Sequence, residues 1–143
     1  IEFIKKVYIK MSISEINKIK NSFKLTEPSL KNQFLNKQEV FELSKLFNII
    51  SHGVYHRDLR YHKHTSLKEM INSKKHLEEL CNKQIDFFCY PEGKNNEDIW
   101  QMCKNSGYKY GLSIAHEPNN PYKIGRYCIN RDKVELLRDL NDT

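Results

Sequence analysis

The amino-acid sequence predicts an α/β fold in which parallel strands alternate with helices. Three short runs rich in β-branched and aromatic residues indicate strands, at residues 47–51, 85–90 and 108–114. Segments with apolar residues at helical spacing lie before and between these runs. Strands that alternate with helices favour parallel layering, either as a barrel or as an open sheet. In both arrangements the chemistry gathers where strands end.

Length and composition indicate one water-soluble domain over residues 1–143. The chain is 38% hydrophobic and 29% charged, and it contains no run near the roughly 20 apolar residues that a membrane span needs. The net charge of +6 is spread along the chain, so a nucleic-acid surface is the less favoured reading. The four cysteines form no C-x-x-C pair, which favours reduced, buried thiols.

The first third of the chain predicts two helices. Ile13, Ile16 and Ile19 suggest an amphipathic helix, and Glu27-Pro28 suggests a break after it. A second helix is expected over 37–46, capped by Asn36 with Glu39 three residues later. The run 47–51 then predicts a buried strand that leads directly into His52.

The middle of the chain predicts two further helices with a strand between them. Ser66 and Glu69 have the spacing of a capping box, which predicts a helix from Ser66 to about residue 82. The strand 85–90 follows, and Pro91-Glu92-Gly93 ends it. Asn95 or Asn96 is expected to cap the next helix, and Gly107 to end it in a left-handed turn.

The last part predicts a strand over 108–114, a loop over 116–122, a short strand over 126–129 and a final helix from Asp132.

His52 and His56 are the first candidates for chemistry, because two imidazoles four residues apart can converge on one cation such as zinc. The spacing alone is weak evidence, since six histidines in 143 residues produce close pairs by chance. His62 and His64 illustrate the ordinary alternative, because they fall in a polar stretch where solvated histidines are expected.

A resemblance to a known family rests on two ordered motifs. The stretch Ile50-Ser51-His52-Gly53-Val54-Tyr55-His56-Arg57-Asp58-Leu59 resembles the second motif of the polysaccharide deacetylases, the NodB homology domain of carbohydrate esterase family 4. Phe87-Phe88-Cys89-Tyr90-Pro91-Glu92-Gly93 resembles the third motif. The match covers about residues 35–135, and its specificity comes from the order and separation of the motifs.

This resemblance implies a distorted or partial (β/α) barrel and a metal-dependent hydrolase that removes acetyl groups from N-acetylated or O-acetylated sugars of a polysaccharide. His52 and His56 occupy the family's two histidine positions and would bind a divalent metal, most often zinc. The backbone N–H of Glu92 would stabilise the oxyanion, Gly93 would allow close packing of the turn, and Tyr90 and Pro91 would shape the groove. An ordinary strand terminator is the alternative reading of this turn.

Two expected parts of the family's machinery are not found in the sequence. The first motif, an Asp-Asp pair that supplies the third ligand and the base, has no counterpart, because no aspartate precedes Asp58. Since the chain begins with Ile1, we expect an incomplete N-terminus, with loss of catalysis as the alternative. Without a missing signal sequence the chain would be cytoplasmic, and with one it would belong to the cell envelope or be secreted.

The late histidine that protonates the leaving amine has only a weak candidate, His116, whose context does not match the family's Leu-x-His. Arg126 could bind substrate, or it could pair with Glu135 or Asp132. Two other functions remain open: a non-catalytic sugar- or metal-binding relative and, less favoured, a basic nucleic-acid-binding domain. The sugar polymer and the oligomeric state do not follow from the sequence.

Overall fold

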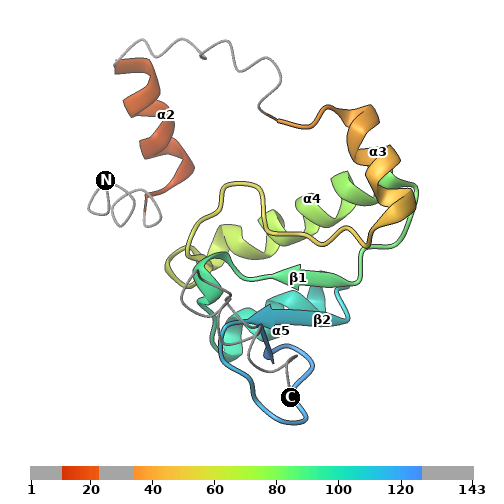
Figure 1. Ribbon diagram of the computed structural model, residues 1–143. Helices are drawn as coiled ribbons and strands as arrows, with labels where there is room; N and C mark the ends of the chain where they lie inside the picture. The colour runs from red at the N-terminus through yellow and green to blue at the C-terminus, as the bar shows by residue number, and fades with distance from the viewer. Residues whose placement is uncertain (1–10, 23–33, 127–143) are drawn as a thin grey trace, which may run out of the picture.

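The computed structural model describes residues 11–22 and 34–126 (Figure 1). Over residues 63–113, helices and strands alternate as the sequence predicts. The first helix, α2, spans Ile13–Ser22, as its isoleucine spacing predicts. Helix α3 spans Lys37–Leu46 and has the predicted bounds. A complete capping box begins α3: Asn36 Oδ1 accepts from the Glu39 amide at 3.0 Å, and the Glu39 carboxylate accepts from the Asn36 amide at 2.7 Å.

The sheet is parallel and its strands lie side by side in chain order. Strands β1 (Phe87–Cys89), β2 (Tyr110–Ser113) and β3 (Ile124–Gly125) form the order β1-β2-β3. Both pairs are parallel. The α/β prediction is therefore confirmed, although β1 and β2 are shorter than the predicted runs.

The predicted strand 47–51 is wrong for all but its last residue. Only Ser51 pairs with the sheet, through a parallel bridge to Phe88 in which the Ser51 amide donates to Phe87 O at 3.0 Å and Ser51 O accepts from the Cys89 amide at 2.7 Å. Phe47 is 64% exposed and Ile50 is 40% exposed. Among the described residues, no strand lies on the side of this segment that faces away from β1. The segment therefore has no second strand with which to form backbone hydrogen bonds.

Helix α4 spans Lys63–Cys81 and begins earlier than predicted. Before it, the chain makes a short 3₁₀ turn, η1 (Leu59–Tyr61), and His62 takes the N-cap position. Ser66 is thus not a cap. It lies inside the helix, and its hydroxyl donates to Leu59 O at 2.8 Å and to His62 O at 2.9 Å.

Helix α5 spans Glu97–Asn105 and follows η2, a 3₁₀ turn over Pro91–Gly93. Of the two predicted caps, Asn96 is the one that accepts from the Ile99 amide, at 3.1 Å. Gly107 follows the helix with φ +83°, the left-handed conformation that its position predicts.

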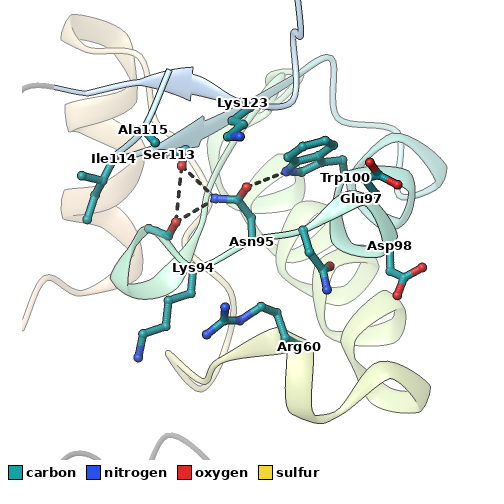
Figure 2. Close-up of a pocket in the computed structure, with 12 residues that line it drawn as sticks. Arg60, Lys94, Asn95, Glu97, Asp98, Trp100, Ser113, Ile114, Ala115 and Lys123 are labelled. Carbon is teal, nitrogen blue, oxygen red and sulfur yellow. Dashed lines mark hydrogen bonds between the residues drawn. The ribbon is translucent and has the colours of Figure 1, made fainter. Parts of the chain in front are cut away.

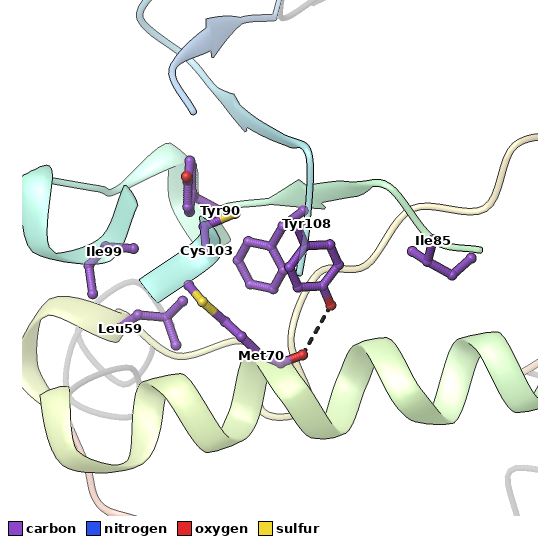
Figure 3. Close-up of a cluster of buried hydrophobic side chains, with 8 residues drawn as sticks. Leu59, Met70, Ile85, Tyr90, Ile99, Cys103 and Tyr108 are labelled. Carbon is purple, nitrogen blue, oxygen red and sulfur yellow. Dashed lines mark hydrogen bonds between the residues drawn. The ribbon is translucent and has the colours of Figure 1, made fainter. Parts of the chain in front are cut away.

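One core joins α4, α5 and the sheet (Figure 3). Its eight buried members are Leu59, Met70, Ile85, Phe88, Tyr90, Ile99, Cys103 and Tyr108. The Tyr108 hydroxyl donates to Met70 O at 3.1 Å, so this buried hydroxyl of the core has a partner. Cys81, Cys89 and Cys103 are free and buried, as expected.

The last predicted elements lie mostly outside the described residues. β3 ends at Gly125 and Arg126 follows it, while residues 127–129 of the predicted strand lie outside the described residues. Residues 127–143, with the helix predicted from Asp132, and the break at 27–28 fall in the ranges that are not described. None of the described helices is both long and apolar enough to cross a membrane.

Candidate functional site

The predicted site residues lie at the carboxyl ends of neighbouring parallel segments. His52 follows the paired residue Ser51, the turn 90–93 follows β1, and His116 comes three residues after β2 ends. Parallel strands bring their carboxyl ends to one edge of a sheet, so these three positions share that edge. The predicted placement of Tyr90–Gly93 at a strand end is confirmed by β1, whereas His52 follows a single paired residue and not the predicted strand.

His52 is held in one tautomer by the neighbouring strand. Its Nδ1 lies 2.6 Å from the backbone carbonyl oxygen of Cys89. A carbonyl oxygen can only accept, so Nδ1 carries the proton and donates it. The Nε2 lone pair is then the available one, which is the arrangement that metal-binding histidines usually have.

His56 lies beside His52 because the loop between them bends sharply. The two ring centroids are 4.7 Å apart with an interplanar angle of 74°. Two residues have positive φ, Gly53 at +81° and His56 at +51°. The left-handed conformation at His56 is uncommon for a residue with a side chain, so the surroundings must stabilise it.

Hydrogen bonding to Cys89 raises the pKa of His52 above its usual value. Burial and the proximity of His56 act in the opposite direction. Protons would therefore compete with a metal ion for this imidazole at a higher pH than they would for a free histidine.

The turn after β1 has the left-handed geometry that brings backbone close to a neighbour. Glu92 has φ +56° and ψ +14°, and Gly93 has φ +66°. A Cβ on Gly93 would lie 2.4 Å from Ile114 Cγ1, so this position accepts only glycine without movement of its neighbour. Tyr90 is fully buried, and its hydroxyl donates to Tyr122 O at 2.9 Å. Pro91 is also buried, so both side chains support the turn from the core side.

Asn95 connects this turn to α5 and β2 (Figure 2). Its amide nitrogen donates to Gly93 O at 2.7 Å and to Ser113 Oγ at 2.8 Å. Its amide oxygen accepts from Trp100 Nε1 at 2.6 Å. These bonds leave the Asn95 side chain in one orientation and tie three elements together.

An open hollow of about 750 Å³ lies beside this network (Figure 2). Gly93, Trp100 and Ser113 line it, together with three cationic side chains, Arg60, Lys94 and Lys123. His52 and His56 do not line it. The hollow is thus adjacent to the predicted oxyanion turn and separate from the histidine pair.

His116 and Arg126 lie near β3. The exposed His116 accepts at Nδ1 from the Gly125 amide at 3.3 Å. Arg126 Nε donates to Ser113 O at 3.3 Å, and its backbone amide donates to the same oxygen at 2.9 Å. Asp132 and Glu135, its predicted alternative partners, lie outside the described residues. The catalytic role of His116 and the substrate-binding role of Arg126 stay predictions.

Across residues 11–22 and 34–126, no cluster of three or more His, Cys, Asp or Glu side chains could hold a metal. Asp58, two residues after His56, is occupied elsewhere: its carboxylate accepts from Arg60 Nε at 2.9 Å and from Arg60 Nη2 at 2.7 Å. Burial opposes ionisation of Asp58, but its bonds to Arg60 outweigh burial and lower its pKa. The histidine pair fits a metal by donor type, and a third ligand is not among the described residues.

Two buried charges, Glu69 and Arg57, lie beside the histidine loop. The capping role that the sequence predicts for Glu69 is wrong, and the sequence assigns no role to Arg57. Glu69 of α4, 4% exposed, accepts from the amides of Val54 and Tyr55, and it forms an ion pair with Arg57. The sequence did carry a signal, because Glu69 adjoins Met70 on the stripe that faces the core. A carboxylate in that position requires a buried partner.

A protein-family model described as "Polysaccharide deacetylase" matches residues 13–111. The poly-beta-1,6-N-acetyl-D-glucosamine N-deacetylase of Staphylococcus aureus (strain MSSA476) is 35% identical over 77 residues, which are 51% of this chain and 27% of that relative. The chain therefore matches about a quarter of the length of the relative.

Solved structures agree on the fold. The Streptococcus pyogenes deacetylase PplD, in complex with acetate, superposes with a TM-score of 0.65 at 23% identity, over 73% of this chain and 50% of that one. IcaB from Ammonifex degensii gives a TM-score of 0.63 at 12% identity, over 77% and 54%. At these identities the likeness establishes the fold alone.

Proposed function

Because this chain belongs to the polysaccharide deacetylase family, we propose that it carries the histidine part of a metal-dependent site that removes acetyl groups from a polysaccharide. His52 and His56 would hold a divalent metal, with zinc as the expected ion. The turn 90–93 would form the adjacent wall, with the Glu92 amide as hydrogen-bond donor.

The observation that carries this proposal is the tautomer of His52. Its bond to Cys89 O at 2.6 Å leaves Nε2 to coordinate, beside the His56 ring at 4.7 Å. A histidine pair in which one ring donates to a carbonyl and the other lies within reach of the same cation has the donor chemistry that zinc prefers.

When bound, the metal would polarise the acetyl carbonyl and acidify a water molecule. Residues of this chain would orient the acetyl group of the substrate. The Glu92 amide would donate to the carbonyl oxygen as it gains negative charge, in a turn fixed by Gly93 and Asn95. His116 would protonate the leaving amine, and Arg126 would contact the sugar chain.

The name of a relative supports a proposal for the substrate class. The matched Staphylococcus aureus protein is named for the removal of N-acetyl groups from poly-β-1,6-N-acetyl-D-glucosamine. We therefore propose an N-acetylated glucosamine polymer as the substrate of the protein that contains this domain.

A second candidate function is a non-catalytic relative that binds metal or sugar. It is favoured by one observation: no third metal-binding side chain joins His52 and His56 among residues 11–22 and 34–126. Catalytic zinc sites usually have three protein ligands.

Metal content after dialysis against Zn²⁺ tests the assignment of the ligands. The chain should retain Zn²⁺, and His52→Ala or His56→Ala should remove it, because each deletes a donor. His64→Ala is the matched control, since His64 is an exposed residue of α4, and it should bind Zn²⁺ like the unchanged chain. Equal metal content in all three variants would contradict the assignment.

Acetate release from N-acetylglucosamine oligomers separates the two candidate functions. Release that is lost in His52→Ala would support the deacetylase. Zinc binding that depends on the histidines, without any acetate release, would instead support the binding role.

A further inference from the structure

We propose that Glu69, together with Arg57, is the positioning residue of the metal loop 52–56. This inference rests on the proposed metal site. It adds the Glu69 carboxylate as the group that fixes the conformation of the loop. Glu69 lies on α4 and does not reach the metal position itself; it acts on the loop backbone.

Both oxygens of the Glu69 carboxylate are committed to the loop. Oε1 accepts from the amide of Val54 at 3.2 Å and from the amide of Tyr55 at 3.1 Å. Oε2 accepts from Arg57 Nη2 at 2.6 Å. One carboxylate thus holds Val54 and Tyr55, which lie between the two histidines, and Arg57, which follows them.

These bonds explain the two positive φ angles of the loop. For the amides of Val54 and Tyr55 to point at the same oxygen, the chain must turn at Gly53, where φ is +81°. A Cβ on Gly53 would lie 3.0 Å from Glu69 Oε1, so the carboxylate approaches the backbone closely at this point. The same anchoring holds His56 at φ +51°, where its ring lies in an edge-to-face arrangement with that of His52.

The pair is buried, and its charges have few other partners. The side chains of Arg57 and Glu69 are 1% and 2% exposed. Arg57 Nη2 also lies 3.5 Å from Thr65 Oγ1, and its guanidinium lies 5.3 Å from the Tyr55 ring centroid. Arg57 Nε has no hydrogen-bond partner within the described part of the chain. An isolated charge is strongly disfavoured in such a place, so each group requires the other.

Two double variants separate the effect of losing the hydrogen-bond acceptor at position 69 from the effect of losing the buried charges. Arg57→Met/Glu69→Gln removes both charges and keeps a side-chain oxygen for the two amides. Arg57→Met/Glu69→Met removes the charges and also the acceptor, at nearly equal side-chain size. The full chain is titrated with Zn²⁺ against a chromophoric chelator, and with Co²⁺ to record the ligand-field absorption bands of the bound ion.

The Gln variant should bind Zn²⁺ within about 3-fold of the unchanged chain, with the same Co²⁺ spectrum. The Met variant should bind about 10- to 100-fold more weakly, the loss typical of removing a group that orients metal ligands. Equal affinities and spectra in two folded variants, checked by near-ultraviolet circular dichroism, would overturn the proposal.

A measurement on the unchanged chain decides the matter if either variant does not fold. In the metal-free protein, the amides of Val54 and Tyr55 should exchange with deuterium much more slowly than those of an unstructured peptide. Exchange at the peptide rate would overturn the positioning role.

His52→Ala separates this proposal from the proposed function. If the unchanged chain and His52→Ala bind Zn²⁺ equally, the metal site itself is wrong. If His52→Ala loses Zn²⁺ while both double variants bind Zn²⁺ equally, the result supports the metal site and contradicts the positioning role of Glu69.

Discussion

Gly93 and Gly107 both have positive φ, at +66° and +83°, but their surroundings differ. A Cβ on Gly93 would lie 2.4 Å from Ile114 Cγ1, whereas a Cβ on Gly107 would come no closer than 3.4 Å to the Lys74 side chain. Gly93 is thus required both by its positive φ and by close packing against Ile114. Gly107 is required by its positive φ alone.

Gly93→Ala should therefore destabilise the protein more than Gly107→Ala. The left-handed conformation costs a non-glycine residue about 1–2 kcal/mol at either position. Crowding against Ile114 should add about 1–3 kcal/mol at Gly93 only. Urea unfolding of both variants measures the difference, and equal losses would show that Ile114 moves aside freely.

Among the elements, α4 holds the chain at the entry to β1. The Glu78 carboxylate accepts from the Ile85 amide at 3.0 Å and pairs with Lys74 Nζ at 2.9 Å. Burial opposes ionisation, but the hydrogen bond from the Ile85 amide and the charge of Lys74 outweigh it, and the pKa of Glu78 falls below its usual value. The ionised form thus fastens the helix to the start of the strand.

This depressed pKa predicts a pH-dependent contribution to stability. Because the pKa is lower in the folded than in the unfolded state, the contribution is present above the unfolded value of about 4.3 and is lost as the pH falls through the folded value. Glu78→Gln should lower the melting temperature at pH 7 and approach the unchanged chain in acid.

Glu79→Gln is the control, since Glu79 is 63% exposed and lies 3.8 Å from Lys75. Its melting temperature should follow that of the unchanged chain throughout. A constant gap between Glu78→Gln and the unchanged chain from pH 7 to pH 2 would contradict the linkage.

For the whole molecule, the core between α4, α5 and the sheet holds the carboxyl edge in place. Met70 is fully buried in it, whereas the next residue, Ile71, is 43% exposed. Met70→Ala should reduce the free energy of unfolding by about 2–5 kcal/mol because it leaves a cavity. Ile71→Ala should cost less than about 1 kcal/mol. Chemical denaturation measures both, and similar losses would mean that the core repacks around the gap.

The histidine pair and the α/β class could be predicted because they depend on local signals. Asn36 and Glu39 mark the start of α3 by their spacing alone. The cap predicted at Ser66 is wrong for the opposite reason: η1 carries the chain into α4 at Lys63, and Ser66 bonds back to Leu59. A capping motif competes with tertiary packing, and here the packing of the preceding turn prevails.

The sequence by itself determined the α/β class, the family and the spacing of the two imidazoles, since periodicity and motif order are properties of the chain. Only the tertiary structure decided the tautomer of His52, set by Cys89 O from the neighbouring strand. It also decided that Glu69 faces the loop and that Asn95 joins Gly93 to Ser113. The partners His52 and Cys89, Val54 and Glu69, and Asn95 and Ser113 are each distant along the chain, so no local pattern records these contacts.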